Sequence, residues 1–176
     1  KTKANGGYYF GRYEASYKDN MHCYSRKSTS TRENSSTELK DGMLWNFITQ
    51  LDAATVARNS FNSSYCDSDL INSYSWDTSL IFMQKYSEYP TYSGLKADYF
   101  GWGLRNTGET NIVTDKACNI YDMASNLSEW STEYSNNLAS ELKGVCRGRR
   151  DTLAETCCVS CFWICNGYLF FVSLLF

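Results

Sequence analysis

Histidine and proline are almost missing from this sequence, which has one of each. Any Ser-His-Asp or Cys-His catalytic arrangement would have to use the single histidine, His22, and so would any His-based metal site. His22 lies in a polar stretch, Asp19–Cys23, without a recognisable catalytic partner. We therefore interpret His22 as a surface residue.

An excess of charge of either sign is also missing. The 17 basic and 19 acidic residues leave a formal charge of −2, which gives no reason to expect nucleic acid or an anionic membrane as partner. The length of 176 residues suits one domain, 1–176. Aromatic residues make up 16% of the chain, and 14 of them are tyrosines, a composition that favours strands and recognition surfaces and argues against disorder.

The eight cysteines form no recognisable framework. Four of them crowd into nine positions near the C-terminus, but the second pair of ligands that a zinc site needs is missing. The other four, Cys23, Cys66, Cys118 and Cys146, are too scattered to suggest disulfides, so the redox compartment stays open. The chain begins at Lys1 without an initiating methionine or an apolar leader, and we expect a fragment or a processed form.

Periodicity predicts a strand over Gly6–Ala15 and two helices. The first helix follows Thr49 as N-cap. Its apolar residues, with Val56 and Ala57 between the others, fit one face: Ile48, Leu51, Ala54, Val56, Ala57 and Phe61. The second begins at Asp67 or Ser68 and ends near Tyr86. Residues 24–40 are predicted to form a surface loop, and the region from Pro90 to Gly108 is rich in turn formers.

The last twenty residues, 157–176, include sixteen apolar ones, so a membrane-spanning helix is an alternative to consider. Against it stand the hairpin signal Asn166-Gly167 and a high content of aromatic and β-branched residues. No basic cluster flanks the segment directly either. We expect paired strands here and no membrane insertion.

The stretch Cys118–Glu133 combines turn formers, small residues and two carboxylates. Asp122 and Glu129 lie seven positions apart, and a looped backbone would bring carbonyl oxygens between them. Hard cations prefer such mixtures of carboxylate and carbonyl oxygens. The alternative is a solvated loop that leads into a strand.

Four motifs carry a resemblance to one family. Tyr8–Glu14 (YYFGRYE) resembles the opening FxxGRYEV strand of formylglycine-generating-enzyme (sulfatase-modifying factor) domains, and Asn119–Trp130 resembles their hallmark N-x-Y-D-M-x-G-N-V-W-E-W. Val145–Gly148 is similar to their VxRGG strand, and Val172–Phe176 to their GFR ending. The resemblance implies an α+β protein with a C-type lectin fold of this type: two helices, a mixed or antiparallel sheet and long irregular loops.

The same resemblance implies a structural calcium ion in the hallmark loop and no organic cofactor. Its ligands would be the side chains of Asp122 and Glu129 and the carbonyl oxygens of Ser125 and Leu127. Ser125 stands where the family commonly has glycine, and a serine adopts the tight backbone of that position less readily than glycine does.

Catalysis is not implied. Active members of the family use two cysteines five apart, shortly after the RGG strand. Here Cys158 falls at the second position but Leu153 at the first, and a redox-active or copper-binding thiol pair cannot be made from a thiol and a leucine. We expect a protein that is not an enzyme, with an oxidase acting on a sulfatase cysteine as the alternative.

A branch of this fold, the variable proteins of diversity-generating retroelements, resembles the chain more closely. These proteins carry a hypervariable segment at the C-terminus, diversified at adenines, which never yields Lys, Glu, Gln, Met or Trp. The tail from Cys157 to Phe176 has none of these except Trp163, although a generic apolar tail would also lack charge. The resemblance implies a hypervariable segment at about 149–171.

We therefore expect a receptor or adhesion protein for protein or cell-surface ligands, on a virion or a bacterial cell surface, without nucleic acid as partner. Strand alternation lets only about half of a strand face outward, and we expect Trp163 to belong to the core. The ligand and the oligomeric state do not follow from the sequence. The expected contact residues are Arg149, Asp151, Cys157, Cys158, Cys161, Phe162, Ile164, Cys165, Asn166, Tyr168, Leu169 and Phe170.

Overall fold

The computed structural model describes residues 7–61, 66–87, 106–108, 116–123, 126–134, 144–148, 158–159 and 161–165, and for Cys66, Val145, Gly148 and the last two ranges the backbone alone. The helices in these ranges are α1 (Gln50–Ser60) and α2 (Ser73–Tyr86). The strands are β1 (Tyr8–Phe10), β2 (Ser16–Asp19), β3 (His22–Tyr24), β4 (Cys66–Leu70), β5 (Lys116–Ala117), β6 (Ile120–Tyr121), β7 (Ser128–Tyr134), β8 (Gly144–Gly148), β9 (Cys158–Val159) and β10 (Cys161–Cys165). This part of the chain is α+β, as predicted.

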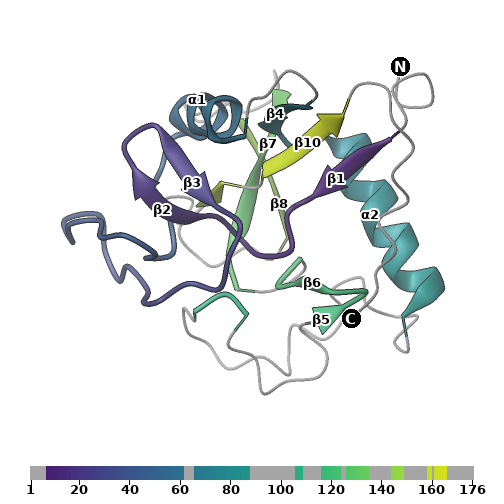
Figure 1. Ribbon diagram of the computed structural model, residues 1–176, viewed down its shortest axis with the longest axis horizontal. Coiled ribbons are helices and arrows are strands. Elements are labelled where there is room, and N and C mark those ends of the chain that lie inside the picture. The colour runs from purple at the N-terminus through teal and green to yellow at the C-terminus, as the bar shows by residue number, and fades with distance from the viewer. Residues whose placement is uncertain are drawn as a thin grey trace.

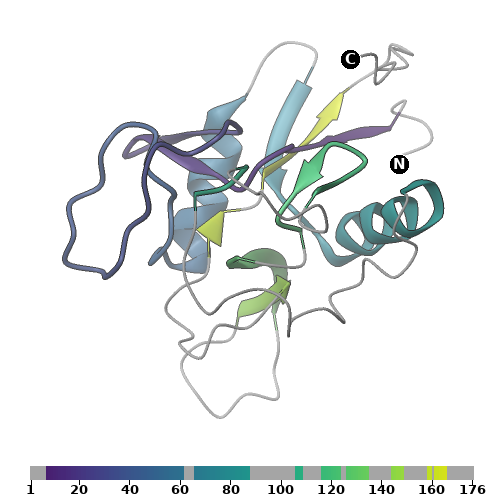
Figure 2. The same cartoon turned by 90° about the horizontal axis from the view of Figure 1, so that it is seen from below.

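Small sheets, rather than one large sheet, organise the described residues (Figure 1). Two of them have three strands, in the orders β1-β10-β4 and β8-β7-β9, and the pairs β2-β3 and β5-β6 form two more. Pairing is antiparallel except between β7 and β9, which run parallel. The β1-β10-β4 sheet lies between the two helices in both views (Figures 1 and 2).

Helix α1 begins where the sequence predicts. The hydroxyl oxygen of Thr49 accepts a hydrogen bond from the main-chain N–H of Asp52, which confirms Thr49 as N-cap. The predicted apolar face is confirmed at Val56 and Ala57, which are buried together with Ala53, but it is wrong at Leu51, which is 76% exposed. Small side chains on the inner face let the helix approach its neighbours closely.

Helix α2 begins later than predicted and ends at Tyr86 as predicted. Its N-cap is Asn72, whose side chain accepts from the N–H of Ser75, and residues 66–70 form β4 instead of a first helical turn. Ser68 does not cap a helix: its hydroxyl donates to the carbonyl of Ala57 in α1. The non-local pairing of β4 with β10 prevails over the local helical pattern.

The N-terminal strand is shorter than predicted, since β1 covers three residues of the predicted 6–15. After Phe10 the backbone follows other partners: the carbonyl of Arg12 accepts from the N–H of Tyr121, and that of Ala15 accepts from the N–H of Trp45. The predicted loop 24–40 is confirmed after Tyr24, which still belongs to β3; the loop residues then form no helix or strand.

The C-terminal segment forms strands where it is described. Strand β10 pairs with β1 on one side and β4 on the other, so its partners come from distant parts of the chain. No helix in the described ranges is long and apolar enough to cross a membrane. The hairpin signal Asn166-Gly167 lies outside the described residues.

Two apolar clusters pack on the two helices. The first joins Ala53, Val56 and Ala57 of α1 to Leu70 and Trp130, and the second joins Trp76 and Met83 of α2 to Ile71, Ala117 and Met123. Tyr8 and Phe10 of β1 pack against the second cluster, while Leu70 of β4 belongs to the first. The β1-β10-β4 sheet therefore contributes to both clusters.

Candidate functional site

The stretch Cys118–Glu133, which carries the hallmark motif, turns tightly on both sides of β6. Cys118, Asn119, Asp122 and Asn126 have φ angles of 51°, 63°, 60° and 63°. Side chains other than glycine seldom adopt this left-handed region, although Asn and Asp tolerate it better than most. Such backbone geometry concentrates at binding loops and other functional sites, and here it turns polar side chains inward.

Glu14 reaches this stretch from the N-terminal part of the chain. Its side chain is 4% exposed and accepts hydrogen bonds from the N–H of Leu127 at 3.0 Å and from Nδ2 of Asn126 at 2.5 Å. The two bonds fix the loop just before β7 against the segment that follows β1. The short GRYE motif and the hallmark motif are therefore in direct contact.

Asp122 is also buried, with 1% of its surface exposed. Its Oδ2 accepts from the hydroxyl of Thr107 at 3.0 Å and from the N–H of Gly108 at 3.1 Å. The Thr107 hydroxyl oxygen accepts in turn from the N–H of Glu14 at 3.2 Å. Residues 106–108 form the predicted turn, and Thr107 links the two buried carboxylate residues.

Glu129 completes a group of three buried carboxylates. It is 2% exposed, and its Oε2 has no hydrogen-bond partner. Burial raises the pKa of Glu129 well above its usual range, and the negative charges of Glu14 and Asp122 raise this pKa further. A proton or a cation at this position would relieve the repulsion.

The fit of this group to calcium is partial. Buried carboxylates with an unsatisfied oxygen suit a hard cation in charge and in donor type. However, no three His, Cys, Asp or Glu side chains within the described ranges are arranged as a metal site. Of the expected ligands, Asp122 and Glu129 lie in one electrostatically connected group, Leu127 adjoins it, and Ser125 lies outside the described residues.

The expected ligand contacts fall at the other end of the sequence, and the structure describes few of them. Cys158 lies in β9, and Cys161, Phe162, Ile164 and Cys165 lie in β10; only their backbones are described. The remaining seven lie outside the described residues: Arg149, Asp151, Cys157, Asn166, Tyr168, Leu169 and Phe170.

The register of β10 nevertheless assigns its residues to two faces of the sheet. Trp163 pairs with Ser68 and Cys161 with Leu70, and both of these β4 residues are buried. Ile164 pairs with Asp67, which is exposed, while Phe162 pairs with Asp69. Directly opposite residues of an antiparallel pair share a face.

The face of Phe162 and Ile164 is not uniform across the sheet. On the β1 side these residues pair with Phe10 and Tyr8, which pack against the cluster beside α2. The Tyr8 hydroxyl also donates to the carbonyl of Ser75 in α2. Asp69 on the β4 side has a side chain that is 37% exposed and paired with Arg58. The open part of this face therefore lies toward β4.

Cys146 is disulfide-bonded, and its partner lies outside the side chains that the structure describes. The sequence, in which the scattered cysteines suggest no disulfide framework, did not reveal this bond. Cys23 and Cys118 are in the thiol form, and burial raises the pKa of the Cys118 thiol, which makes it less reactive.

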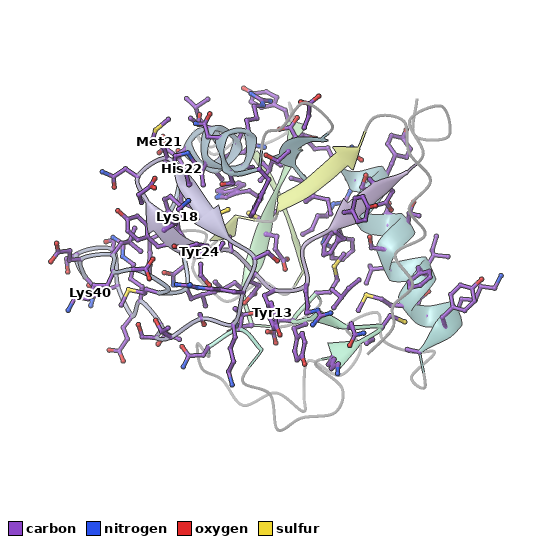
Figure 3. The ribbon with its side chains drawn as sticks, in the orientation of Figure 1. Tyr13, Lys18, Met21, His22, Tyr24 and Lys40 are labelled. Carbon is purple, nitrogen blue, oxygen red and sulfur yellow. The ribbon has the colours of Figure 1, made fainter. Side chains whose placement is uncertain are left out.

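The hairpin β2-β3 carries the single histidine on the surface, as predicted. Its Nδ1 lies 2.7 Å from Oδ1 of Asp19, a partner that the sequence did not reveal, and its side chain is 40% exposed. On the same hairpin, Lys18 Nζ lies 5.7 Å from the ring centre of Tyr24 (Figure 3). The thiol of Cys23, between His22 and Tyr24 in β3, is buried and belongs to the cluster beside α1.

Sequence reasoning missed the roles of Glu14, Thr107 and Asn126. The sequence offered a signal for Glu14 alone, which follows aromatic residues in an expected strand. A glutamate that is buried in such a strand needs hydrogen-bond partners. Thr107 stood in a turn without any such signal.

Comparison with known proteins gives no family: no protein-family model, no curated protein and no solved structure matches this chain.

Proposed function

We propose that the chain is a non-enzymatic ligand-binding protein with a C-type lectin fold of the formylglycine-generating-enzyme type, in which a C-terminal variable segment contacts the ligand. The variable segment spans about 149–171. Its ligand is a protein or a cell-surface molecule, and the protein belongs on a virion or a bacterial cell surface. The proposal rests on the hallmark motifs and on the position of β10.

The position of β10 is the observation that carries the proposal. A strand that pairs on both sides has its backbone held by main-chain hydrogen bonds, which do not depend on the side chains. Outward side chains on such a strand can be exchanged at small cost to stability. On the β4 side the register supports Phe162 and Ile164 as outward residues, because their partners there are Asp69 and Asp67. On the β1 side their partners pack against the cluster beside α2, so the exchangeable surface lies toward β4.

The three buried carboxylates, Glu14, Asp122 and Glu129, support the proposed fold rather than the proposed ligand contacts. Glu14 connects the GRYE motif to the hallmark loop, and both motifs belong to the family resemblance. Four left-handed residues and three buried carboxylates build a loop that is determined by its contacts rather than by local propensity. We propose a structural calcium ion beside Asp122 and Glu129, with the carbonyls of Ser125 and Leu127.

The genome neighbourhood tests the variable-segment proposal. A retroelement-diversified protein has a nearby reverse transcriptase gene and a near-identical template repeat that differs from the tail-coding DNA at adenines. Flanking DNA that contained neither would overturn the proposed origin of the segment. The alternative activity is tested by incubating the chain with a sulfatase-type peptide, because conversion of the peptide cysteine to formylglycine would replace the binding proposal with an oxidase.

The register puts Cys161 and Cys165 on the same face of β10 as Trp163, opposite the buried residues Leu70 and Ser68, so these two expected contacts are kept constant in the test. Binding itself is tested with a displayed library in which the other ten proposed contact positions are varied and the rest of the chain is kept. Selection against intact bacterial cells should enrich tail sequences that bind them. A matched library, varied at the described surface of the β2-β3 hairpin, should not be enriched. Equal enrichment of both libraries would contradict a binding site in the tail.

A further inference from the structure

Two cysteines face each other across one end of the β4-β10 pair. Cys66 opens β4 and Cys165 closes β10, and the antiparallel register pairs them directly. The register is continuous over five residue pairs, from Cys161 opposite Leu70 to Cys165 opposite Cys66. Directly opposite residues have Cα atoms about 4.5 or 5.5 Å apart, and disulfides span Cα separations of about 4.4–6.8 Å.

We propose that Cys66 and Cys165 form a disulfide that fastens the C-terminal end of β10 to β4. The two residues also share a face of the sheet, which a bond between them requires. The bond would hold the end of β10 in place whichever side chains occupy the opposite face. It goes beyond the proposed function and does not depend on any ligand.

The disulfide of Cys146 is compatible with this pairing. Cys146 lies in β8 of the other three-stranded sheet, β8-β7-β9, where it pairs with Trp130. Cys23 and Cys118 are thiols. If Cys66 pairs with Cys165, the candidate partners of Cys146 are therefore Cys157, Cys158 and Cys161.

The bond forms by thiol–disulfide exchange with a small disulfide such as oxidised glutathione. The thiolate of Cys66 attacks one sulfur of the oxidant and displaces a glutathione thiolate, which leaves a mixed disulfide. The thiolate of Cys165 then attacks the Cys66 sulfur and displaces the second glutathione. The two cysteines lose two protons and two electrons, and the oxidant is reduced to two thiols.

A peptide map of the whole chain tests the pairing without any substitution. The chain is folded with reduced and oxidised glutathione, alkylated without reductant and cleaved with chymotrypsin after Tyr65, Leu70, Trp163 and Tyr168. The expected product is peptide Cys66–Leu70 joined to peptide Ile164–Tyr168, which separates into two peptides on reduction. Recovery of Cys66 as an alkylated thiol, or joined to another cysteine, would overturn the proposal.

Thiol counts on variants give an independent result. If the two cysteines pair with each other, Cys66→Ser and Cys165→Ser each raise the number of titratable thiols in the denatured, unreduced chain by one. The double variant then leaves the number unchanged. A double variant with two thiols fewer would show that both cysteines are unpaired. A double variant with two thiols more would show that each is paired with another cysteine. Cys118→Ser is the control and lowers the count by one, because Cys118 is a thiol.

Discussion

The main-chain N–H of Leu127 donates a 3.0 Å hydrogen bond to Oε1 of Glu14, across 113 positions of sequence. The same carboxylate accepts from Asn126 through Oε2. Replacement of Glu14 by alanine leaves the buried N–H of Leu127 without this acceptor, and we expect a loss of about 2 kcal/mol in the free energy of unfolding. The expected loss is smaller than the sum of two charged hydrogen bonds, because the substitution also removes the repulsion between the negative charge of Glu14 and Glu129.

Chemical denaturation of Glu14→Ala measures this loss. Glu33→Ala serves as the control, since Glu33 is exposed, and we expect a change within about 0.5 kcal/mol there. Equal stabilities of the two variants would show that Glu14 does not hold the hallmark loop.

Stability should depend on the protonation of Glu129. Its pKa is raised in the folded protein, so the folded state binds the proton more tightly than the unfolded state does. This favourable contribution is complete below the unfolded pKa of about 4.3 and is lost as pH rises through the folded pKa. Chelator-treated wild type should therefore lose stability relative to Glu129→Gln as pH rises through that window.

Denaturation midpoints of the two proteins, measured side by side from pH 4 to pH 8, isolate this contribution from those of other carboxylates. The difference between the midpoints should grow with pH up to the folded pKa of Glu129 and then level off. Parallel profiles would contradict a raised pKa.

The proposed calcium ion should reverse that pH effect. A divalent cation stabilises the ionised form of Glu129, so its binding releases a proton and raises the melting temperature of the folded chain. We expect calcium to raise the melting temperature of the wild type at neutral pH, and to do so much less for Glu129→Gln. Scanning calorimetry with calcium and with chelator provides the measurement, and no difference in the wild type would argue against the site.

Gln50 ties α1 to the sheet β8-β7-β9. Its Nε2 donates to the carbonyl of Ser131 at 2.6 Å and to that of Glu133 at 2.7 Å, next to the register shift in β7. We expect Gln50→Ala to cost about 1–2 kcal/mol in the free energy of unfolding, because two main-chain acceptors lose a partner.

Leu51→Ala is the matched control one position later. Leu51 is a larger apolar residue but is 76% exposed, so its truncation should cost less than about 0.5 kcal/mol. Urea denaturation compares the two variants. A greater loss for Leu51 would contradict the orientation of α1.

The sequence predicted those helix ends that depend on contacts between neighbouring residues. Thr49 caps α1 because its side chain and the N–H of Asp52 lie within one turn, and Tyr86 ends α2 where expected. The start of α2 was missed because residues 66–70 pair with β10, almost a hundred positions later. Leu51 was placed inside because apolar spacing alone does not reveal that the buried face of α1 consists of Ala53, Val56 and Ala57.

In the candidate site, too, the sequence revealed residues of one local motif but not the distant residues that contact them. Asp122 and Glu129 were identified from their motif, whereas Glu14 and Thr107 join them through contacts that span 15 to 113 positions. The disulfide of Cys146 was missed because distance in sequence says little about distance in a folded sheet. Residue type indicated which side chains carry charge, and only the fold could show which of them are buried together.

The central claim is that β10 offers one exchangeable face on a fixed backbone. The most direct measurement compares the free energies of unfolding of Ile164→Ser and Trp163→Ser, neighbours that the register assigns to opposite faces. We expect Ile164→Ser to lose less than about 1 kcal/mol, and Trp163→Ser to lose about 3–5 kcal/mol, as for a large core residue. Similar large losses for both would mean that β10 is covered on both faces, and would contradict a ligand-binding surface there.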